Sequence, residues 1–218
     1  MLKLGRHRTT IAIAAAVAGI LLTAGAPRAL ADSCSSSTTI VLDLTDLHGV
    51  TGPFVNVLVC LGADTSSAAG IQATTATFTF TSLTQGGDTY LMGDGASLAI
   101  NTNGNISLVP NSITWTGGNN DGIGADTGFS STGSRNVNGF GNFNFSLKDN
   151  GGFAEAVTSI TFTIQKTSGT WASASSVLAT NNKGDLAAAH IFPSAFKGTC
   201  TGYVTDGGTK SGTTWTSS

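Results

Sequence analysis

Residues 159–166, Ser-Ile-Thr-Phe-Thr-Ile-Gln-Lys, alternate strictly between polar and apolar side chains up to the final lysine. Ile160, Phe162 and Ile164 take every second position, and hydroxyl or amide side chains stand between them. Because successive side chains of a strand point to opposite sides, this period of two predicts a β-strand with one buried and one solvated face. Strands of this kind are typical of antiparallel sheets.

Two further segments repeat the alternation. In Ala73–Thr81, threonines stand on one face, opposite Ala76, Phe78 and Phe80, and Asn142–Lys148 alternates in the same way. In the latter segment the expected inward side chains are Phe143, Phe145 and Leu147, and the expected outward ones are Asn142, Asn144, Ser146 and Lys148. Each segment predicts a strand with one wet face.

Other segments predict strands without this clear alternation. Phe54–Leu61 is apolar at every position except Asn56 and is expected to be buried on both faces, paired with a first strand at Thr38–Leu44. Shorter strands are expected at Ser97–Asn101, Asn105–Val109, Ile113–Thr116, Leu186–Phe192 and Gly202–Val204. The Asn103-Gly104 pair favours a tight hairpin between the first two of these short strands.

Many short strands separated by Gly and Asn turns are typical of a sandwich or a jelly roll. The sequence therefore predicts an all-β fold, an antiparallel β-sandwich or jelly-roll-like single domain over residues 32–218. The stretch Gly117–Gly139 is rich in Gly, Asn, Ser and Thr and is expected to form one long loop. Loops of that length are uncommon unless they serve a function.

Residues 1–31 have the three parts of a secretory signal peptide. Lys3, Arg6 and Arg8 give a positive start, Ile11–Ala24 is an apolar run, and Ala29–Ala31 offers a small-x-small cleavage site. The apolar run is shorter than the roughly 20 residues that cross a bilayer, so we expect cleavage and no stable membrane anchor. The predicted location of the product is secreted, at the cell surface or in the extracellular matrix.

The charge of the exported part excludes several classes of partner. Four of the ten Lys and Arg residues lie in residues 1–31, so residues 32–218 carry six bases against twelve acids, a net charge of −6. Nucleic acids and anionic membrane surfaces are bound by basic surfaces, and both are therefore excluded as expected partners. A polar, weakly charged exterior suits a carbohydrate-rich or envelope setting.

Three cysteines, Cys34, Cys60 and Cys200, belong to the exported part. In an oxidising compartment one pair is expected to form a disulfide and one thiol to remain free. The sequence allows all three pairings. We favour Cys34–Cys200, which would tie the two ends together and leave Cys60 as a buried thiol within an apolar strand.

The chain carries no recognisable catalytic constellation, and we predict that it is not an enzyme. Glu155 is the only glutamate, and most aspartates stand in turn sequences, so paired carboxylates for glycan cleavage are not evident. No Gly-x-Ser-x-Gly elbow accompanies the histidines, and His190 is expected to be a sheet residue. A hydrolase using Asp126, Glu155 or His190 is the least favoured hypothesis.

Two weak ligand signals remain. Residues 121–126 nearly match the Gly-Gly-x-Gly-x-Asp calcium repeat, which makes Asp121 and Asp126 candidate calcium ligands, although the repeat occurs once where a calcium β-roll stacks several. An exposed tryptophan stacks well on a sugar ring, and Trp215, in a polar tail, is the candidate. Trp115 is expected in the core, and Trp171 is expected to cap the sandwich. No cofactor is expected beyond this structural calcium.

Four segments within residues 137–192 together resemble a known bacterial family. These segments are Gly139–Phe145, Thr158–Ile164, Thr167–Trp171 and Leu186–Phe192. They are similar to the secreted β-domains of PEP-CTERM proteins, which are exosortase-sorted surface and exopolysaccharide-associated proteins. The resemblance implies an extracellular β-sandwich and supplies no catalytic residues, because the shared residues are strand-core apolars and turn glycines.

The chain departs from that family at its end. Family members finish with Val-Pro-Glu-Pro, an apolar helix and a basic tail, and residues 212–218 contain no such sorting signal. The chain is either a relative released without anchoring or a truncated one. The favoured function is a secreted, non-enzymatic surface or matrix protein able to self-associate through its sheet edges. The alternative is a glycan-binding module that uses the Gly117–Gly139 loop, with calcium as an optional ligand.

Overall fold

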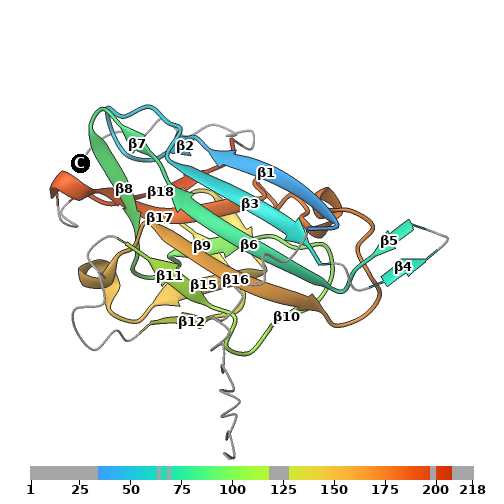
Figure 1. The fold of residues 1–218 in the computed structure, drawn as a ribbon. Coiled ribbons are helices and arrows are strands. Elements are labelled where there is room, and N and C mark those ends of the chain that lie inside the picture. Colours follow the sequence, from blue (N-terminus) through green and yellow to red (C-terminus); the bar gives the residue numbers. More distant parts are fainter. Residues whose placement is uncertain (1–33, 63–64, 68–69, 118–127, 197–199, 208–218) are drawn as a thin grey trace, which may run out of the picture. The chain divides into compact units, whose positions relative to one another are not determined.

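The structure, a computed structural model, describes residues 34–62, 65–67, 70–117, 128–196 and 200–207 (Figure 1). The strands of the first sheet are β1 (Ser36–Leu42), β3 (Val55–Leu61), β6 (Thr75–Ser82), β10 (Ile106–Leu108), β11 (Thr114–Thr116) and β16 (Ser159–Lys166). The strands of the second are β2 (Leu44–Thr45), β7 (Thr84–Gln85), β8 (Asp88–Met92), β9 (Leu98–Ile100), β12 (Phe129–Ser131), β15 (Phe145–Asp149), β17 (Ala187–Pro193) and β18 (Gly202–Thr205). Two further hairpins are β4 (Thr65–Ser67) with β5 (Gly70–Gln72), and β13 (Arg135–Val137) with β14 (Gly141–Phe143).

The first sheet follows the alternation of the sequence. Its order is β1-β3-β6-β16-β10, with β11 also paired to β16, and all of these pairs are antiparallel (Figure 1). Phe162 of β16 stands opposite Phe78 of β6, and Leu42 of β1 opposite Val55 of β3. The predicted pairing of the first strand with the Phe54–Leu61 segment is thereby confirmed.

The second sheet has the order β12-β15-β9-β17-β18-β2, again antiparallel, and β8 pairs with the far end of β17. Leu98 pairs with Ala189 and Met92 with Ile191, so the five residues Gly93–Ser97 bulge outward opposite the single residue His190. Bulges of this kind re-aim side chains and are frequent beside functional sites.

One core lies between the two sheets. Phe162 of the first sheet stacks on Phe145 of the second with ring centroids 5.6 Å apart, and on Phe78 of its own sheet at 5.4 Å. The same cluster contains fully buried Trp171, whose indole N–H donates to the Asn103 carbonyl oxygen at 3.0 Å. The all-β, sandwich-like fold is thereby confirmed. Within the described part of the chain, no helix is long and apolar enough to cross a membrane.

Part of the outer face of the second sheet is covered, which corrects one position of the Asn142–Lys148 segment. Asn142, Asn144 and Lys148 are exposed as expected, whereas Ser146 is buried. The β13–β14 hairpin lays Phe140 and Phe143 over this face as a separate apolar cluster. A bend at Asn144 separates β14 from β15, so the buried side chains of Phe143 and Phe145 belong to different clusters.

The Gly117–Gly139 stretch is not one loop, because β12 and β13 form within its described part.

A second part of the outer face of the second sheet is covered by η1 (Gly152–Glu155), a 3₁₀-helix that packs Phe153 against Phe192. Two further short 3₁₀-helices are η2 (Ala174–Val177) and η3 (Ser194–Phe196).

The predicted hairpin at Asn103-Gly104 is wrong. β9 belongs to the second sheet and β10 to the first, so the chain crosses between sheets at this turn, where Gly104 has a φ of +100°. β9 has no free edge for β10, because Ile100 already pairs with Phe145 on one side and with Ala187 on the other. Distant partners therefore override the local turn signal.

The predicted Cys34–Cys200 disulfide is also wrong. The bridge joins Cys34 to Cys60, with 5.2 Å between their Cα atoms, and Cys200 is a free, exposed thiol. Antiparallel pairing of β1 with β3 sets Ser36 opposite Leu61, which brings Cys34 beside the end of β3. Cys200 precedes β18 in the other sheet.

Candidate functional site

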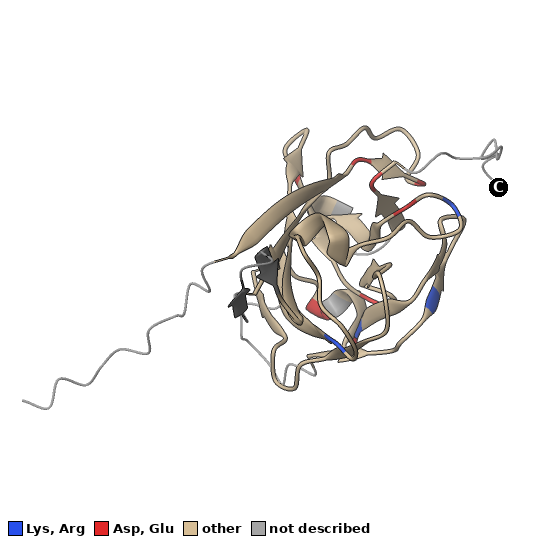
Figure 2. Cartoon of the chain, turned by 90° about the vertical axis from the view of Figure 1, so that its right-hand side faces the viewer, with Lys and Arg blue, Asp and Glu red and all other residues tan. Residues whose placement is uncertain are grey.

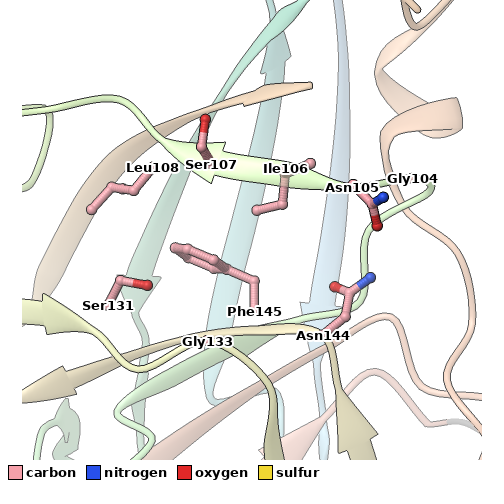
Figure 3. Close-up of a pocket in the computed structure, with 9 residues that line it drawn as sticks. All are labelled: Gly104, Asn105, Ile106, Ser107, Leu108, Ser131, Gly133, Asn144 and Phe145. Atoms are coloured by element: carbon pink, nitrogen blue, oxygen red, sulfur yellow. The ribbon is translucent and has the colours of Figure 1, made fainter. Parts of the chain in front are cut away.

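A cleft opens where the two sheets part at one side of the sandwich (Figure 3). Its upper wall is β10, an edge strand of the first sheet, and its floor is β15 with the segment that follows β12 in the second. The cleft has a volume of about 380 Å³. It exists because the chain crosses between sheets at Gly104, which leaves β10 facing β15 without a ladder between them.

The middle of the cleft is apolar. Ile106 and Leu108 point from β10 toward Phe145 of β15, while Ser107 points away from the cleft (Figure 3). This direction follows from register, because Ile106 and Leu108 stand opposite Lys166 and Ile164 on the inner side of β16. Ile106 and Leu108 are half-buried, so the cleft exposes part of the sandwich core.

Asn144 is a fixed polar group at one end of the cleft. Its amide oxygen accepts from the backbone N–H of Thr102 at 2.8 Å and from the Thr102 hydroxyl at 3.1 Å. Its amide nitrogen donates to the Thr102 carbonyl oxygen at 2.8 Å. Thr102 is itself buried, so the Asn144 amide is oriented before any ligand arrives.

Two exposed polar side chains complete the rim. The Asn105 amide faces Asn144 across one end, and the Ser131 hydroxyl stands beneath Leu108 at the other (Figure 3). Both side chains are exposed. An amide can donate and accept, and a hydroxyl can do both, so the rim offers both kinds of hydrogen bond to a ligand.

The floor beneath Ser131 is fastened to β15. The buried Ser146 hydroxyl donates to the Gly133 carbonyl oxygen at 3.0 Å and lies 2.6 Å from the Thr132 hydroxyl oxygen. The Thr132 backbone N–H donates to the Ser146 carbonyl oxygen at 3.0 Å. Gly133 has a φ of +68°, a left-handed conformation that suits glycine. These contacts give the cleft a rigid floor.

None of the residues that line the cleft carries an ionisable side chain. Charged residues are sparse along the described ribbon as a whole (Figure 2). Across the described ranges, no three His, Cys, Asp or Glu side chains gather as a group able to hold a metal ion. The residues that line the cleft therefore offer a ligand apolar contact and neutral hydrogen bonds.

His190 is the centre of a second polar group, on the outer face of the second sheet. The Gly93–Ser97 bulge brings the Asp94 carboxylate to 3.9 Å from the imidazole Nδ1 atom. Tyr203, opposite on β18, stacks on the imidazole with ring centroids 4.2 Å apart, and its hydroxyl donates to the Gly95 carbonyl oxygen at 3.1 Å. Phe153 meets the imidazole edge-on at 4.8 Å.

Burial sets the ionisation of this group. It lowers the pKa of His190 below the ordinary value of 6.5, and the nearby Asp94 carboxylate raises that pKa by less. Burial also raises the pKa of Tyr203. The imidazole lies on the outer side of β17 between aromatic rings, so the predicted position of His190 in a sheet is confirmed. Its Nδ1 atom is buried and has no hydrogen-bond partner among the described residues.

The other residues singled out from the sequence have separate positions. Glu155 lies in η1, and its carboxylate packs so close to Gly151 that a β-carbon there would collide with it. Trp115, expected in the core, is partly buried against it and packs on Phe129 at 5.5 Å. Trp171, expected as a cap over the core, is buried within it. Asp121, Asp126 and Trp215, the candidate calcium and sugar residues, lie outside the described residues.

The sequence did not single out the cleft residues. Asn105 and Asn144 each stand next to a strand, where an asparagine is commonly a turn residue. The one available signal was the polar Asn144 between two phenylalanines, which coincides with the bend that ends β14. Scans of the chain against protein-family profiles, characterised proteins and solved structures find no match. Fold and site together define an antiparallel β-sandwich with an uncharged cleft between edge strands.

Proposed function

We propose that the chain is a secreted, non-enzymatic β-sandwich protein of the bacterial surface or extracellular matrix, and that its cleft binds uncharged polysaccharide. One observation carries the proposal: the cleft combines an apolar floor with neutral hydrogen-bonding groups at both ends and contains no charge. A sugar ring matches this arrangement, because it presents C–H groups on its faces and hydroxyls around its edge.

The size of the cleft suits a short segment of a glycan. Its 380 Å³ falls near the lower end of the range of about 300–1,000 Å³ typical of small-molecule pockets. Half-buried Ile106 and Leu108 supply the apolar surface, opposite the nearly buried Phe145 ring, and Asn105 and Asn144 would bond the hydroxyls at one end. Because Asn144 is already held by Thr102, little side-chain entropy is lost on binding.

Export is supported by two features. The Cys34–Cys60 disulfide is typical of proteins that fold in an oxidising compartment. Residues 1–31 have the composition of a signal peptide, and the segments similar to PEP-CTERM β-domains agree with a bacterial surface or exopolysaccharide setting.

The test is binding of soluble neutral oligosaccharides of the cello, chito, xylo and manno series, measured by calorimetry. A tryptophan at position 131 would fill the cleft from its rim, so Ser131→Trp should weaken binding by at least about tenfold. Ser134→Trp, at an exposed position three residues further on and outside the cleft, is the matched control and should bind normally.

A chelator arm separates this proposal from the calcium-assisted alternative. Since no carboxylate lines the cleft, binding should persist in the presence of chelator. Binding that disappears with chelator, or that Ser131→Trp and Ser134→Trp leave equally intact, would contradict a role for the cleft and direct attention to Asp121 and Asp126.

A further inference from the structure

The outer face of the first sheet carries an array of threonines. The outward positions are the ones whose neighbours along each strand point into the core, and the register aligns them in rows across β1, β3, β6, β16 and β11 (Figure 1). The threonines of this threonine face are Thr39, Thr75, Thr77, Thr79, Thr81, Thr114, Thr116, Thr161 and Thr163. The other outward residues of these strands are Ser37, Val41, Asn56, Leu58, Cys60, Ser159 and Gln165.

The threonine face is uncharged. None of the outward residues of these five strands is Asp, Glu, Lys, Arg or His, and none is aromatic. A domain surface commonly carries about a quarter to a third charged residues, so a five-strand face without any is unusual. A face of this kind gains nothing from an ionic partner, and its hydroxyl groups are buried at low cost only against a partner that hydrogen-bonds to them.

The hydroxyl groups on this face are ordered by one another. The Thr77 and Thr163 hydroxyl oxygens lie 2.9 Å apart, and those of Thr79 and Thr161 lie 3.0 Å apart, each pair bridging β6 and β16. Threonine is β-branched and stiff about χ1, so the array keeps its geometry. The repeat is about 4.8 Å between strands and about 6.8 Å along each strand.

Two exposed apolar side chains also lie on the threonine face. Val41 and Leu58 are 41% and 40% exposed, and they are the large hydrophobic side chains that stand out from the surface among the described residues. Both lie on the threonine face, in adjacent rows of β1 and β3. The Cys34–Cys60 bridge pins the same two strands at the corner of the face.

We propose that the threonine face docks on the surface of an insoluble, ordered, uncharged polysaccharide. Such a surface repeats hydroxyl and C–H groups at regular intervals, and each threonine presents one hydroxyl and one methyl group in return. A second copy of the chain is a poorer partner, because residues 32–218 carry a net charge of −6 and two copies repel each other. The absence of aromatic side chains distinguishes this contact from stacking on a single sugar chain.

This docking surface is separate from the cleft and does not depend on it. The cleft takes a single soluble chain segment, whereas the threonine face requires many chains held side by side. The two sites therefore differ in the form of polymer that they bind, and variants of each can be tested against both forms.

The experiment measures retention of the purified chain on microcrystalline cellulose and on chitin. Leu58→Lys places an ammonium group in the middle of the face, and burying it unpaired should lower the partition constant by at least about tenfold. Thr180→Lys, at an exposed position outside the first sheet, is the matched control and should be retained like the wild type. Retention should persist in about 1 M NaCl, because no charges are involved.

A double variant tests the hydroxyls without adding charge. Thr79→Val with Thr161→Val removes both members of a bonded pair while keeping their shape, which leaves stability nearly unchanged. Retention should fall while the melting temperature holds. Wild-type chain that is retained on neither polymer, or Leu58→Lys retained as well as Thr180→Lys, would overturn the proposal. Retention lost in Ser131→Trp would also overturn it, by assigning the insoluble polymer to the cleft.

Discussion

The polar side chains at both sites are held in place by their neighbours. Asn144 is useful as a rim group because three hydrogen bonds to Thr102 hold its amide, and His190 is held between Tyr203 and Phe153. The alternation of the sequence placed His190 in a strand but did not predict its neighbours, because Asp94 lies on a bulge, and a bulge has no periodic pattern. The surroundings of His190 depend on contacts between segments that lie far apart in the sequence.

The buried position of His190 predicts how stability depends on pH. The folded pKa lies below 6.5, so the unfolded chain binds the proton more readily than the folded one. Stability is therefore full above pH 6.5 and is lost as the pH falls below 6.5 toward the folded pKa. Unfolding by urea between about pH 8 and about pH 5 should show this loss in the wild type.

His190→Phe removes the titrating group while keeping an aromatic ring between Tyr203 and Phe153. The acid loss should be smaller in this variant, and His48→Gln, at an exposed histidine, serves as the matched control. An acid profile of His190→Phe that superimposes on that of the wild type would show that His190 does not carry the effect.

At the scale of strands, the alternation of polar and apolar residues predicted most elements but not all of their partners. The period of two located β6 and β16, and the apolar run Phe54–Leu61 located β3 and its pairing with the first strand. The Asn103-Gly104 signal failed because the two edges of β9 are taken by β15 and β17, which lie far along the chain. Pairing is decided by the whole sheet, whereas a turn signal is local.

The disulfide is the element-scale feature that the sequence left open, and it yields a direct prediction. Cys34→Ser should lower the free energy of unfolding by about 2–4 kcal/mol, because the bridge closes a loop between residues 26 apart and so restricts the unfolded chain. Cys200→Ser removes a free, exposed thiol and should leave the unfolding curve unchanged. Urea unfolding of the two variants without reductant makes the comparison. An equal loss in the two variants would instead indicate a Cys34–Cys200 bridge.

At the scale of the whole molecule, function is proposed to lie where the two sheets part. The cleft residues come from β10 and the turn before it, from the end of β12 and the segment after it, and from the start of β15 and the bend before it, so no contiguous stretch of sequence contains the site. The sequence predicted the sandwich and its low charge, which together favoured a surface or matrix protein, with glycan binding as the alternative. It could not place the cleft, since that required knowing that β9 and β10 belong to different sheets.

The most direct measurement is an NMR titration of the isotope-labelled chain with the neutral oligosaccharide that binds best. Binding in the cleft should give saturable shifts of the Asn105 and Asn144 side-chain amides and of the Gly104 and Gly133 backbone amides, because these residues line the cleft. The signal of the Tyr203 amide, beside His190 on the covered face, should not shift. Saturable binding that shifts Tyr203 and its neighbours while the four cleft signals stay in place, or the absence of any shift at high sugar concentration, would contradict binding in the cleft.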